Sequence, residues 1–175
     1  QSIIICPTRE LATQVAAEMR KLARLSHNLK VLTLFGGTPI GPQIGSLEHG
    51  AHIIVGTPGR ILDHIGKRTL DLSGVRTLVL DEADRMLDMG FGEDIAAIID
   101  QIPTNRQTLL FSATFPANIL GMSRQIQQYP VSVKAENAES NSDISQVFFE
   151  TKKNEKYLTL ISLIGKYQPE SGIIF

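Results

Sequence analysis

The sequence predicts an α/β fold in which a largely parallel sheet carries helices on both faces. Two observations support this prediction. Short apolar runs recur along residues 3–133, and longer segments between them space their apolar residues as a helix does. Because consecutive parallel strands need a crossover connection, usually a helix, this alternation favours a parallel sheet. Ligands of such sheets bind beyond the carboxyl ends of the strands.

The first helix has the clearest pattern of all the elements. Its residues Leu11, Val15, Met19 and Leu22 follow one another at spacings of four, four and three, which places them on one face. A helix is expected after each of the other strands as well. The expected strands are residues 3–6, 31–35, 52–55, 77–80, 108–111 and 131–133.

A domain boundary is expected near residue 135. Residues 135–145, A-E-N-A-E-S-N-S-D-I-S, are small, polar and acidic without a usable period, which predicts a linker after a first domain at 1–134. Residues 146–150, 156–167 and 172–175 then predict a strand, a helix and a strand. These are too few to close a core, so residues 146–175 are expected to begin a second α/β domain.

The composition is that of an ordinary globular protein, with 42% hydrophobic and 20% charged residues in 175. Seventeen Lys and Arg against eighteen Asp and Glu give a formal net charge of -1, so the chain has no basic surplus that would indicate or exclude RNA. The single cysteine, Cys6, lies in an apolar run, which favours a buried thiol in a reducing cytoplasm. No run approaches the roughly 18 apolar residues of a membrane-spanning helix, and the first residues lack a signal-peptide layout, so no membrane partner is expected.

Two adjacent carboxylates, Asp81 and Glu82, end the apolar run at 77–80. One carboxylate at a strand end can hold a hydrated Mg²⁺ on the phosphates of a nucleotide, while its neighbour orients the attacking water. Taken alone, the motif is better explained as the surface end of a buried strand. No G-x-x-x-x-G-K-[ST] phosphate loop occurs in the 175 residues.

Two further strand ends have the features of anion sites. Thr57 is expected to cap a helix that starts at Pro58, which leaves Arg60 and the positive helix end available to a phosphate. Thr8 and Arg9 repeat this design after the first strand. Ordinary capping explains either site alone, but two such sites at one sheet edge weaken that explanation.

Small and hydroxyl residues follow two other strands. Gly36 and Gly37 would let a nucleic-acid backbone approach closely, although a plain turn explains them equally well. Ser112 and Thr114 follow the run at 108–111 and are expected near Asp84, with which they could exchange hydrogen bonds. The alternative is a strand end with a capping threonine.

The motifs P-T-R-E-L-A, G-G, T-P-G-R, D-E-A-D and S-A-T occur in this order, with strand and helix spacing between them. In this combination the chain resembles the DEAD-box ATP-dependent RNA helicases, and its wording is most similar to the bacterial DbpA type, which acts on ribosomal RNA. Residues 1–134 resemble most of the first RecA-like domain of that family. Residues 146–175 resemble the beginning of the second.

The resemblance implies ATP and Mg²⁺ as cofactors and RNA, as a single strand or short duplex, as the partner. It implies that Asp81 and Glu82 bind Mg-ATP and activate water, with Asp81 reaching the metal through water. Asp84, Ser112 and Thr114 would couple hydrolysis to the closing of two domains. The residues that would contact the RNA backbone are Thr8, Arg9, Gly37, Gln43, Thr57, Gly59 and Arg60.

Parts of the family pattern are absent from the 175 residues: the phosphate loop, the adenine-reading segment and the arginine-bearing blocks of the second domain. This chain alone is therefore expected not to hydrolyse ATP. Since the phosphate-loop strand is central in a RecA-like sheet, unpaired backbone groups and an apolar slot in the sheet are expected, and self-association is one way to cover them.

The sequence thus predicts part of an RNA helicase that unwinds or remodels short duplexes, with ribosome assembly as its setting. Two alternatives remain: a catalytically silent RNA- or protein-binding module derived from a helicase, and a DNA helicase of the same superfamily. No metal site beyond Mg²⁺ is predicted, because the histidine spacing does not suit zinc. Residues expected at the surface or in packing are His27, His49, His52, His64, Met86, Met89 and Phe91.

Overall fold

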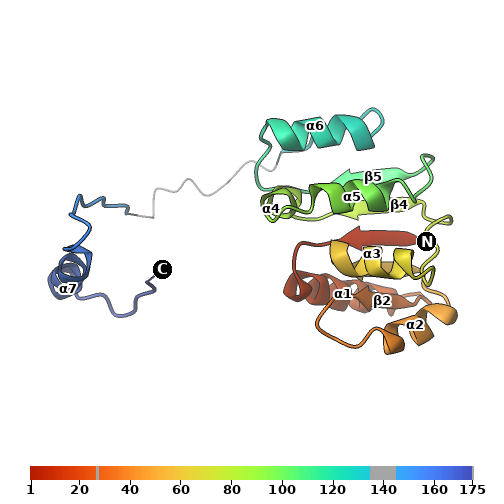
Figure 1. Ribbon diagram of the computed structural model, residues 1–175, viewed down its shortest axis with the longest axis horizontal. Coiled ribbons are helices and arrows are strands. Elements are labelled where there is room, and N and C mark those ends of the chain that lie inside the picture. Colours follow the sequence, from red (N-terminus) through yellow and green to blue (C-terminus); the bar gives the residue numbers. More distant parts are fainter. Residues whose placement is uncertain (27, 135–144, 175) are drawn as a thin grey trace. The chain divides into compact units, whose positions relative to one another are not determined.

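The computed structural model describes residues 1–26, 28–134 and 145–174, in two compact units, Gln1–Val131 and Ser132–Phe175. His27 and most of the predicted linker, residues 135–144, lie outside the described residues. The strands are β1 (Ser2–Ile5), β2 (Val31–Leu34), β3 (Ile53–Gly56), β4 (Thr77–Leu80) and β5 (Gln107–Leu110). The helices are α1 (Arg9–Ala23), α2 (Gly41–Glu48), α3 (Pro58–Gly66), α4 (Ala83–Asp88), α5 (Gly92–Ile99), α6 (Ala117–Ile126) and α7 (Lys156–Tyr167) (Figure 1).

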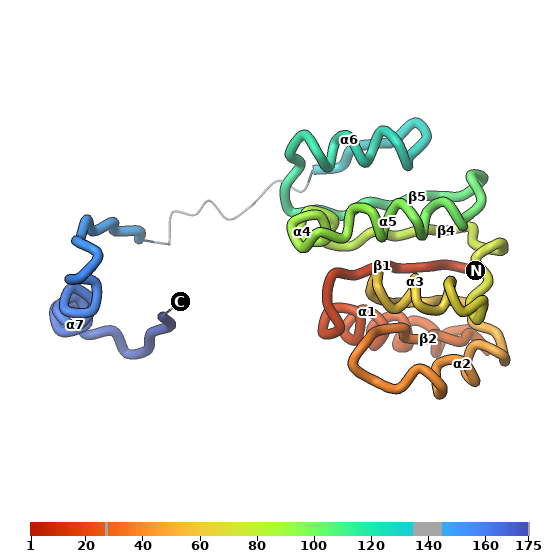
Figure 2. The backbone as a smooth tube through the Cα atoms, viewed as in Figure 1, coloured from red at the N-terminus to blue at the C-terminus, as the bar shows by residue number. Residues whose placement is uncertain are grey.

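The first unit is built on one parallel sheet of five strands in the order β2-β3-β1-β4-β5, which confirms the predicted fold class. β1 comes first in the chain but lies in the middle of the sheet, between β3 and β4 (Figure 2). Its Ser2 pairs with Ile53 of β3 and with Thr77 of β4, the first residues of those strands. Because strands of equal length that start level also end level, the loops after the strands meet at one edge of the sheet.

Both faces of β1 are buried, which explains why its sequence is apolar without alternation. Ile3 and Ile5 pack in a core cluster with residues of α3, α4, α5 and α6. Ile4 and Cys6 point to the opposite face, where they pack with α1. Helices therefore cover both faces of the sheet, and within the described ranges none is long and apolar enough to cross a membrane.

The helices after β1 and β3 begin at the predicted residues. Thr8 is the N-cap of α1, and its side-chain oxygen accepts a hydrogen bond from the backbone N–H of Leu11 at 3.3 Å. Thr57 is the N-cap of α3 and Pro58 is the first helical residue, but no side chain bonds across this cap. The first N–H groups of α3 therefore lack a capping partner from Thr57 at the sheet edge.

Two expectations about the sheet are wrong. The described residues 131–133 form no strand, and Val131 and Val133 are 87% and 86% exposed, because β-branched residues form a strand only beside a neighbouring strand. The five strands pair without interruption, so no apolar slot divides them. The unpaired side of the sheet lies instead at its two outer strands, and Phe111, directly after β5, is 55% exposed.

In the second unit, α7 forms over the predicted residues, Lys156–Tyr167. The strands expected at 146–150 and 172–175 are wrong, since the described residues 146–150 and 172–174 have no strand conformation. No residue of α7 is buried. One amphipathic helix cannot bury its own apolar face, and neither segment has a described strand to pair with.

Candidate functional site

The predicted site residues, with the exception of Gln43, follow the carboxyl ends of the strands at one edge of the sheet. They form two groups, one over β2, β3 and β1 and an acidic one over β4 and β5. In the order of the strands across the sheet, they are Gly37 after β2; Thr57, Gly59 and Arg60 after β3; Thr8 and Arg9 after β1; Asp81, Glu82 and Asp84 after β4; and Ser112 and Thr114 after β5.

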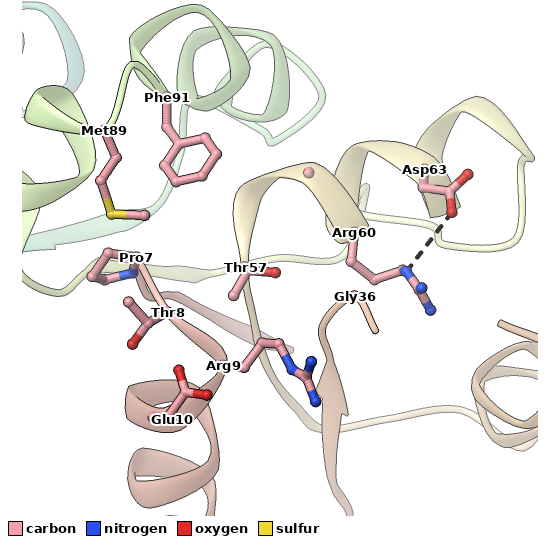
Figure 3. A pocket seen from close by; sticks show the side chains of 11 residues that line it. Pro7, Thr8, Arg9, Glu10, Gly36, Thr57, Arg60, Asp63, Met89 and Phe91 are labelled. Carbon is pink, nitrogen blue, oxygen red and sulfur yellow. Dashed lines mark ion pairs between the residues drawn. The ribbon is translucent and has the colours of Figure 1, made fainter. Parts of the chain in front are cut away.

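A cleft of about 590 Å³ lies in the first group (Figure 3). The N-terminal ends of α1 and α3 both contribute to it. The structure thus brings together residues that are separated by about 50 positions in the chain. The predicted residues that line it are Thr8, Arg9, Thr57, Gly59 and Arg60, and the further lining residues are Pro7, Glu10, Gly36, Asp63, Met89 and Phe91.

Arg9 is the first residue of α1, and its guanidinium carbon lies 5.6 Å from the centre of the Phe35 ring. This cation–π contact holds the side chain against the loop after β2. Gly37, in that loop, has a positive φ of 76°, and a Cβ at this position would collide with the Arg9 guanidinium. Gly37 does not line the cleft, so its direct effect in the structure is to leave room for Arg9.

Arg60 lies in the first turn of α3, and its side chain is only 12% exposed. One terminal nitrogen, Nη2, donates to the carbonyl of Thr38 at 3.0 Å, and Nε lies 3.7 Å from a carboxylate oxygen of Asp63. The other terminal nitrogen, Nη1, is buried without a hydrogen-bond partner among the described residues. Leaving a charged donor unpaired is costly, so an anion that accepted a hydrogen bond from Nη1 would be favoured. The positive end of the α3 dipole would favour the same anion.

Gln43 is not part of the cleft. It lies in α2 with 9% of its surface exposed, and its side-chain amide bonds to Phe35 and Thr38 of the loop after β2 and to His64 of α3. Its predicted contact with RNA therefore has no support from its position.

The three apolar residues that follow the acidic group differ in their surroundings. Met86 is fully buried, as expected for a packing residue. Met89 is 48% exposed and lines the cleft together with Phe91, which also packs against the core (Figure 3). The interpretation of Met89 as core filler is therefore wrong, because α4 ends at Asp88 and the left-handed turn at Gly90 redirects the chain.

The acidic group begins with Asp81, at the end of β4. Burial raises the pKa of Asp81, and the charge of Glu82 adds to this against an opposing backbone hydrogen bond. Burial, followed by the charges of Asp81 and Glu82, also raises the pKa of the Cys6 thiol to about 12. Cys6 is thus a buried thiol, as the sequence predicts, and its raised pKa keeps it protonated at neutral pH.

Glu82 has a left-handed backbone with φ at 51° and is the N-cap of α4. For a residue with a Cβ this conformation costs roughly 1–3 kcal/mol, and such strain is found most often at functional sites. Its Oε2 accepts a hydrogen bond from Arg85 at 3.1 Å. The pair is largely exposed, so it adds little to stability.

The acidic group fits a metal that arrives with a nucleotide better than a metal bound by protein alone. No Lys or Arg of the described residues forms an ion pair with Asp81. Within the same residues, no group of three or more His, Cys, Asp and Glu side chains could enclose a metal ion. A hydrated Mg²⁺ needs only one or two carboxylates when substrate phosphates supply the other ligands.

Asp84 joins β4 to β5 through hydrogen bonds to Thr114 and Ser112. Its Oδ2 accepts from the backbone N–H of Thr114 at 2.9 Å and from the Thr114 hydroxyl at 2.7 Å. The backbone N–H of Asp84 donates to the Ser112 hydroxyl at 3.3 Å, and that hydroxyl donates to the carbonyl of Thr114 at 2.7 Å. The pKa of Asp84 is lowered, mainly by the hydrogen bond from the Thr114 side chain, so the carboxylate is charged at neutral pH.

Sequence reasoning missed Asp63 and Met89. Asp63 could have been found, since it lies three residues after Arg60 on a helix, a spacing at which opposite charges meet. No sequence signal distinguished Met89 from Met86.

Comparison with known proteins gives consistent results. The model of the DEAD/DEAH box helicase family matches residues 1–121. The whole chain is 49% identical to ATP-dependent RNA helicase DbpA of Escherichia coli, covering 38% of that protein, and 47% identical to DEAD-box ATP-dependent RNA helicase CshA of Bacillus licheniformis, covering 36% of it. The chain therefore spans less than two fifths of these relatives.

Two solved structures share the fold. A DEAD box protein from the hyperthermophile Methanococcus jannaschii matches 94% of this chain and 44% of its own, with a TM-score of 0.75 and 43% identity. A hypothetical ATP-dependent RNA helicase from Sulfolobus tokodaii matches 73% of this chain and 38% of its own, with a TM-score of 0.68 and 41% identity. The sheet described above is thus the RecA-like sheet of DEAD-box proteins.

Proposed function

The chain belongs to the DEAD/DEAH box helicase family, and from this membership we propose that it is part of an ATP-dependent RNA helicase that unwinds or remodels short RNA duplexes. One observation carries the proposal at the level of the site. A cleft with two arginines at two helix starts lies on the same sheet edge as the adjacent carboxylates Asp81 and Glu82. Such an edge can hold an RNA backbone and a nucleotide at once.

In this proposal the cleft binds the RNA backbone. Arg9 and Arg60 supply charge, and Thr8 and Thr57 lie beside them at the two helix starts. Gly59 has open space where a Cβ would stand, so a phosphate could approach the first N–H groups of α3. Contacts to phosphate and sugar carry little sequence information, which suits a single strand or a short duplex of any sequence.

The apolar side of the cleft suits the sugars and bases of the same strand. Met89 exposes about half of its side chain there, and Phe91 lies beside it (Figure 3). Carbon atoms of a ribose or the face of a base would bury this surface, as bases do on apolar and aromatic side chains in other single-strand binders.

The acidic group serves ATP in this proposal. Asp81 would hold Mg²⁺ through water, and the ion neutralises charge on the phosphates of ATP when it is bound. Glu82 orients the attacking water and accepts its proton. Since Arg85 already donates to Oε2 of Glu82, Oε1 is the oxygen available for that water.

Asp84, Ser112 and Thr114 couple hydrolysis to domain closure in this proposal. Their hydrogen bonds join residues about 30 positions apart through short side chains, of which Thr114 is exposed and Asp84 and Ser112 are half-buried. A shift of the loop after β4 would therefore move the loop after β5.

The motifs that these 175 residues contain limit which activity they can have alone. The 175 residues hold no phosphate-loop pattern, and so this chain alone should not hydrolyse ATP. Residues 1–134 would form most of the first RecA-like domain, 135–145 the linker and 146–175 the beginning of the second. The unpaired edge at β5 makes self-association of this chain a further expectation.

The RNA target and the cellular process are proposed from the resemblance to the DbpA type. That resemblance supports ribosomal RNA as the target and ribosome assembly as the process. The buried, protonated Cys6 agrees with a reducing compartment, the cytoplasm.

The second candidate is a silent RNA- or protein-binding module that retains the cleft without hydrolysis. The missing phosphate-loop pattern favours it for these 175 residues. The bonded Asp84 and Thr114 favour the helicase, since a module that only binds has no need of a link between the loops after β4 and β5.

RNA-stimulated phosphate release separates the two candidates. This chain would be compared with the same chain extended by a phosphate-loop segment and a complete second RecA-like domain. Release from the extended chain only is the expected result. Release from neither would contradict the helicase and favour the silent module, and release from the chain alone would contradict the proposed need for a phosphate loop.

A further inference from the structure

His64 is a buried polar residue with both ring nitrogens bonded. It lies in α3 with 0% of its surface exposed, and Gln43 is the other polar residue among the buried ones described. Its Nε2 lies 3.0 Å from Oε1 of Gln43, and its Nδ1 lies 2.8 Å from the hydroxyl of Thr69. Buried polar side chains are costly to keep unless they are bonded, so the arrangement invites a functional explanation.

The direction of each hydrogen bond can be assigned from the partners. Nε2 of Gln43 donates to the carbonyl of Phe35 at 3.2 Å and to the hydroxyl of Thr38 at 3.0 Å. Its Oε1 must then accept, so Nε2 of His64 carries the proton. The Thr69 hydroxyl has one proton and two acceptors within reach, Nδ1 of His64 at 2.8 Å and the backbone carbonyl of His64 at 3.2 Å. We assign the proton to the shorter contact, so Nδ1 accepts it and the imidazole is neutral.

The electrostatic surroundings agree with a neutral imidazole. Burial chiefly lowers the pKa of His64, and Arg60 and Lys67 lower it further while Asp63 opposes them. These three charged groups belong to α3 and its C-terminal end. The groups that bond the ring from outside the helix, Gln43 and Thr69, carry no charge.

The network ends in the loop that supports the two arginines of the cleft. Gln43 bonds Phe35 and Thr38, at the two ends of that loop. The carbonyl of Thr38 accepts from Nη2 of Arg60 at 3.0 Å, and the guanidinium of Arg9 lies over Phe35. A chain of contacts therefore runs from His64 through Gln43 and the loop to both cationic side chains.

We propose that His64 is a positioning residue of the cleft, which through Gln43 fixes the loop 35–38 and thereby the arrangement of Arg9 and Arg60 around a bound RNA phosphate. This inference rests on the proposed RNA-binding function of the cleft. His64 itself does not line the cleft, so its effect on RNA is transmitted by the loop.

The test uses two substitutions at residue 64 in this chain. In His64→Gln, the side-chain amide nitrogen can take the place of Nε2 and donate to Gln43. His64→Asn is shorter, so its amide reaches toward Thr69 but leaves Oε1 of Gln43 without its donor. The matched control is Ile61→Val, a buried change on the same helix that belongs to the apolar core.

The measurement is the affinity for a labelled ten-nucleotide uridine RNA by fluorescence anisotropy, with the thermal midpoint recorded for every variant. His64→Asn is expected to bind about three- to tenfold more weakly, the effect of one lost hydrogen bond, and His64→Gln to bind as the unmodified chain does. Ile61→Val should lower the midpoint without changing the affinity.

Three results would overturn the inference: unchanged affinity in His64→Asn, an equal loss in His64→Gln, or a loss in Ile61→Val that follows the fall in midpoint. If the unmodified chain binds no RNA, the proposed function fails and takes the inference with it. If it binds and His64→Asn binds equally, the inference alone fails.

A second variant decides the matter if His64→Asn does not fold. Thr38→Val lies on the exposed loop and removes the hydroxyl that accepts from Gln43 without entering the core. Its affinity for the RNA is expected to fall about twofold at an unchanged thermal midpoint, because Gln43 loses its bond to Thr38 but keeps its bond to Phe35. Unchanged affinity in Thr38→Val would overturn the inference.

Discussion

The two halves of the sheet edge differ in how completely this chain builds them. Over β2, β3 and β1, α1 covers one face and α3 lies on the other, and the loops enclose a cleft. Over β4 and β5, the edge ends in an outer strand and an exposed Phe111, with carboxylates that lack a cationic partner at Asp81. In the described residues, α1 is the helix of the core cluster on its face of the sheet, and β4 contributes only the partly buried Val79 to that cluster.

This difference suggests that binding and hydrolysis are separable in the chain. The cleft takes its groups from residues that this chain contains, including two arginines, two helix starts and a buried support at Gln43 and His64. The acidic half offers carboxylates and a link between two loops but no group to hold the phosphates. We therefore expect RNA binding without ATP hydrolysis from these 175 residues.

The largest effect is expected from Glu82→Gln in an extended chain that hydrolyses ATP. The amide cannot accept the proton of the attacking water, so turnover should fall by about 10²- to 10⁴-fold while ATP binding is kept. Steady-state phosphate release and nucleotide affinity measure the two. Unchanged turnover would remove Glu82 from the catalytic assignment.

Arg60→Ala tests the other half of the edge. RNA affinity should fall about tenfold, and the slope of log K against log salt should shrink by about 0.7, the value for one phosphate contact on a single strand. Arg24→Ala removes the same charge at the C-terminal end of α1, about 22 Å along that helix from Arg9, and should change the slope little. Equal effects from both variants would mean that only net charge matters.

Met89→Ser sharpens the comparison within the cleft. Losing the apolar contact should weaken RNA binding about two- to fivefold, yet the salt slope should stay the same because no counterion is involved. Leu120 on α6 exposes a similar apolar side chain away from the cleft lining, so Leu120→Ser serves as the control. A changed slope in Met89→Ser would count against an apolar contact.

The smallest effect concerns pH. The pKa of His64 is lowered from 6.5 in the folded chain, so the unfolded state binds more protons just below pH 6.5. Stability from this group is thus complete above 6.5 and is lost as pH falls through the folded pKa, by at most about 1.4 kcal/mol per pH unit. Denaturant titrations should show this slope reduced in His64→Gln, and an identical slope would contradict a buried neutral histidine.

The fold and the position of the acidic group could be predicted because both depend on where the strands lie and end in the sequence. Apolar runs located β1 to β5 within a residue or two, and parallel strands bring their carboxyl ends together, so Thr114 could be expected near Asp84, and the two form a hydrogen bond. Val131 and Val133 have the same local preference, but a strand also needs a neighbour, which the local sequence does not reveal.

The parts that could not be predicted depend on side-chain direction. Gln43 matched a contact residue by position, but its side chain is directed inward to His64. His64 was one of four similar histidines, and only its place on the inner side of α3 distinguishes it. Met86 and Met89 differ because a helix ends between them, and helix ends are set by packing as much as by sequence.

RNA binding by this chain without ATP hydrolysis can be measured by titrating the chain into labelled single-stranded RNA, without nucleotide, at several salt concentrations. We expect binding for which the slope of log K against log salt is about -1.4 or steeper, as for at least two arginine–phosphate contacts. Absence of binding at low salt, or binding that does not depend on salt, would contradict it.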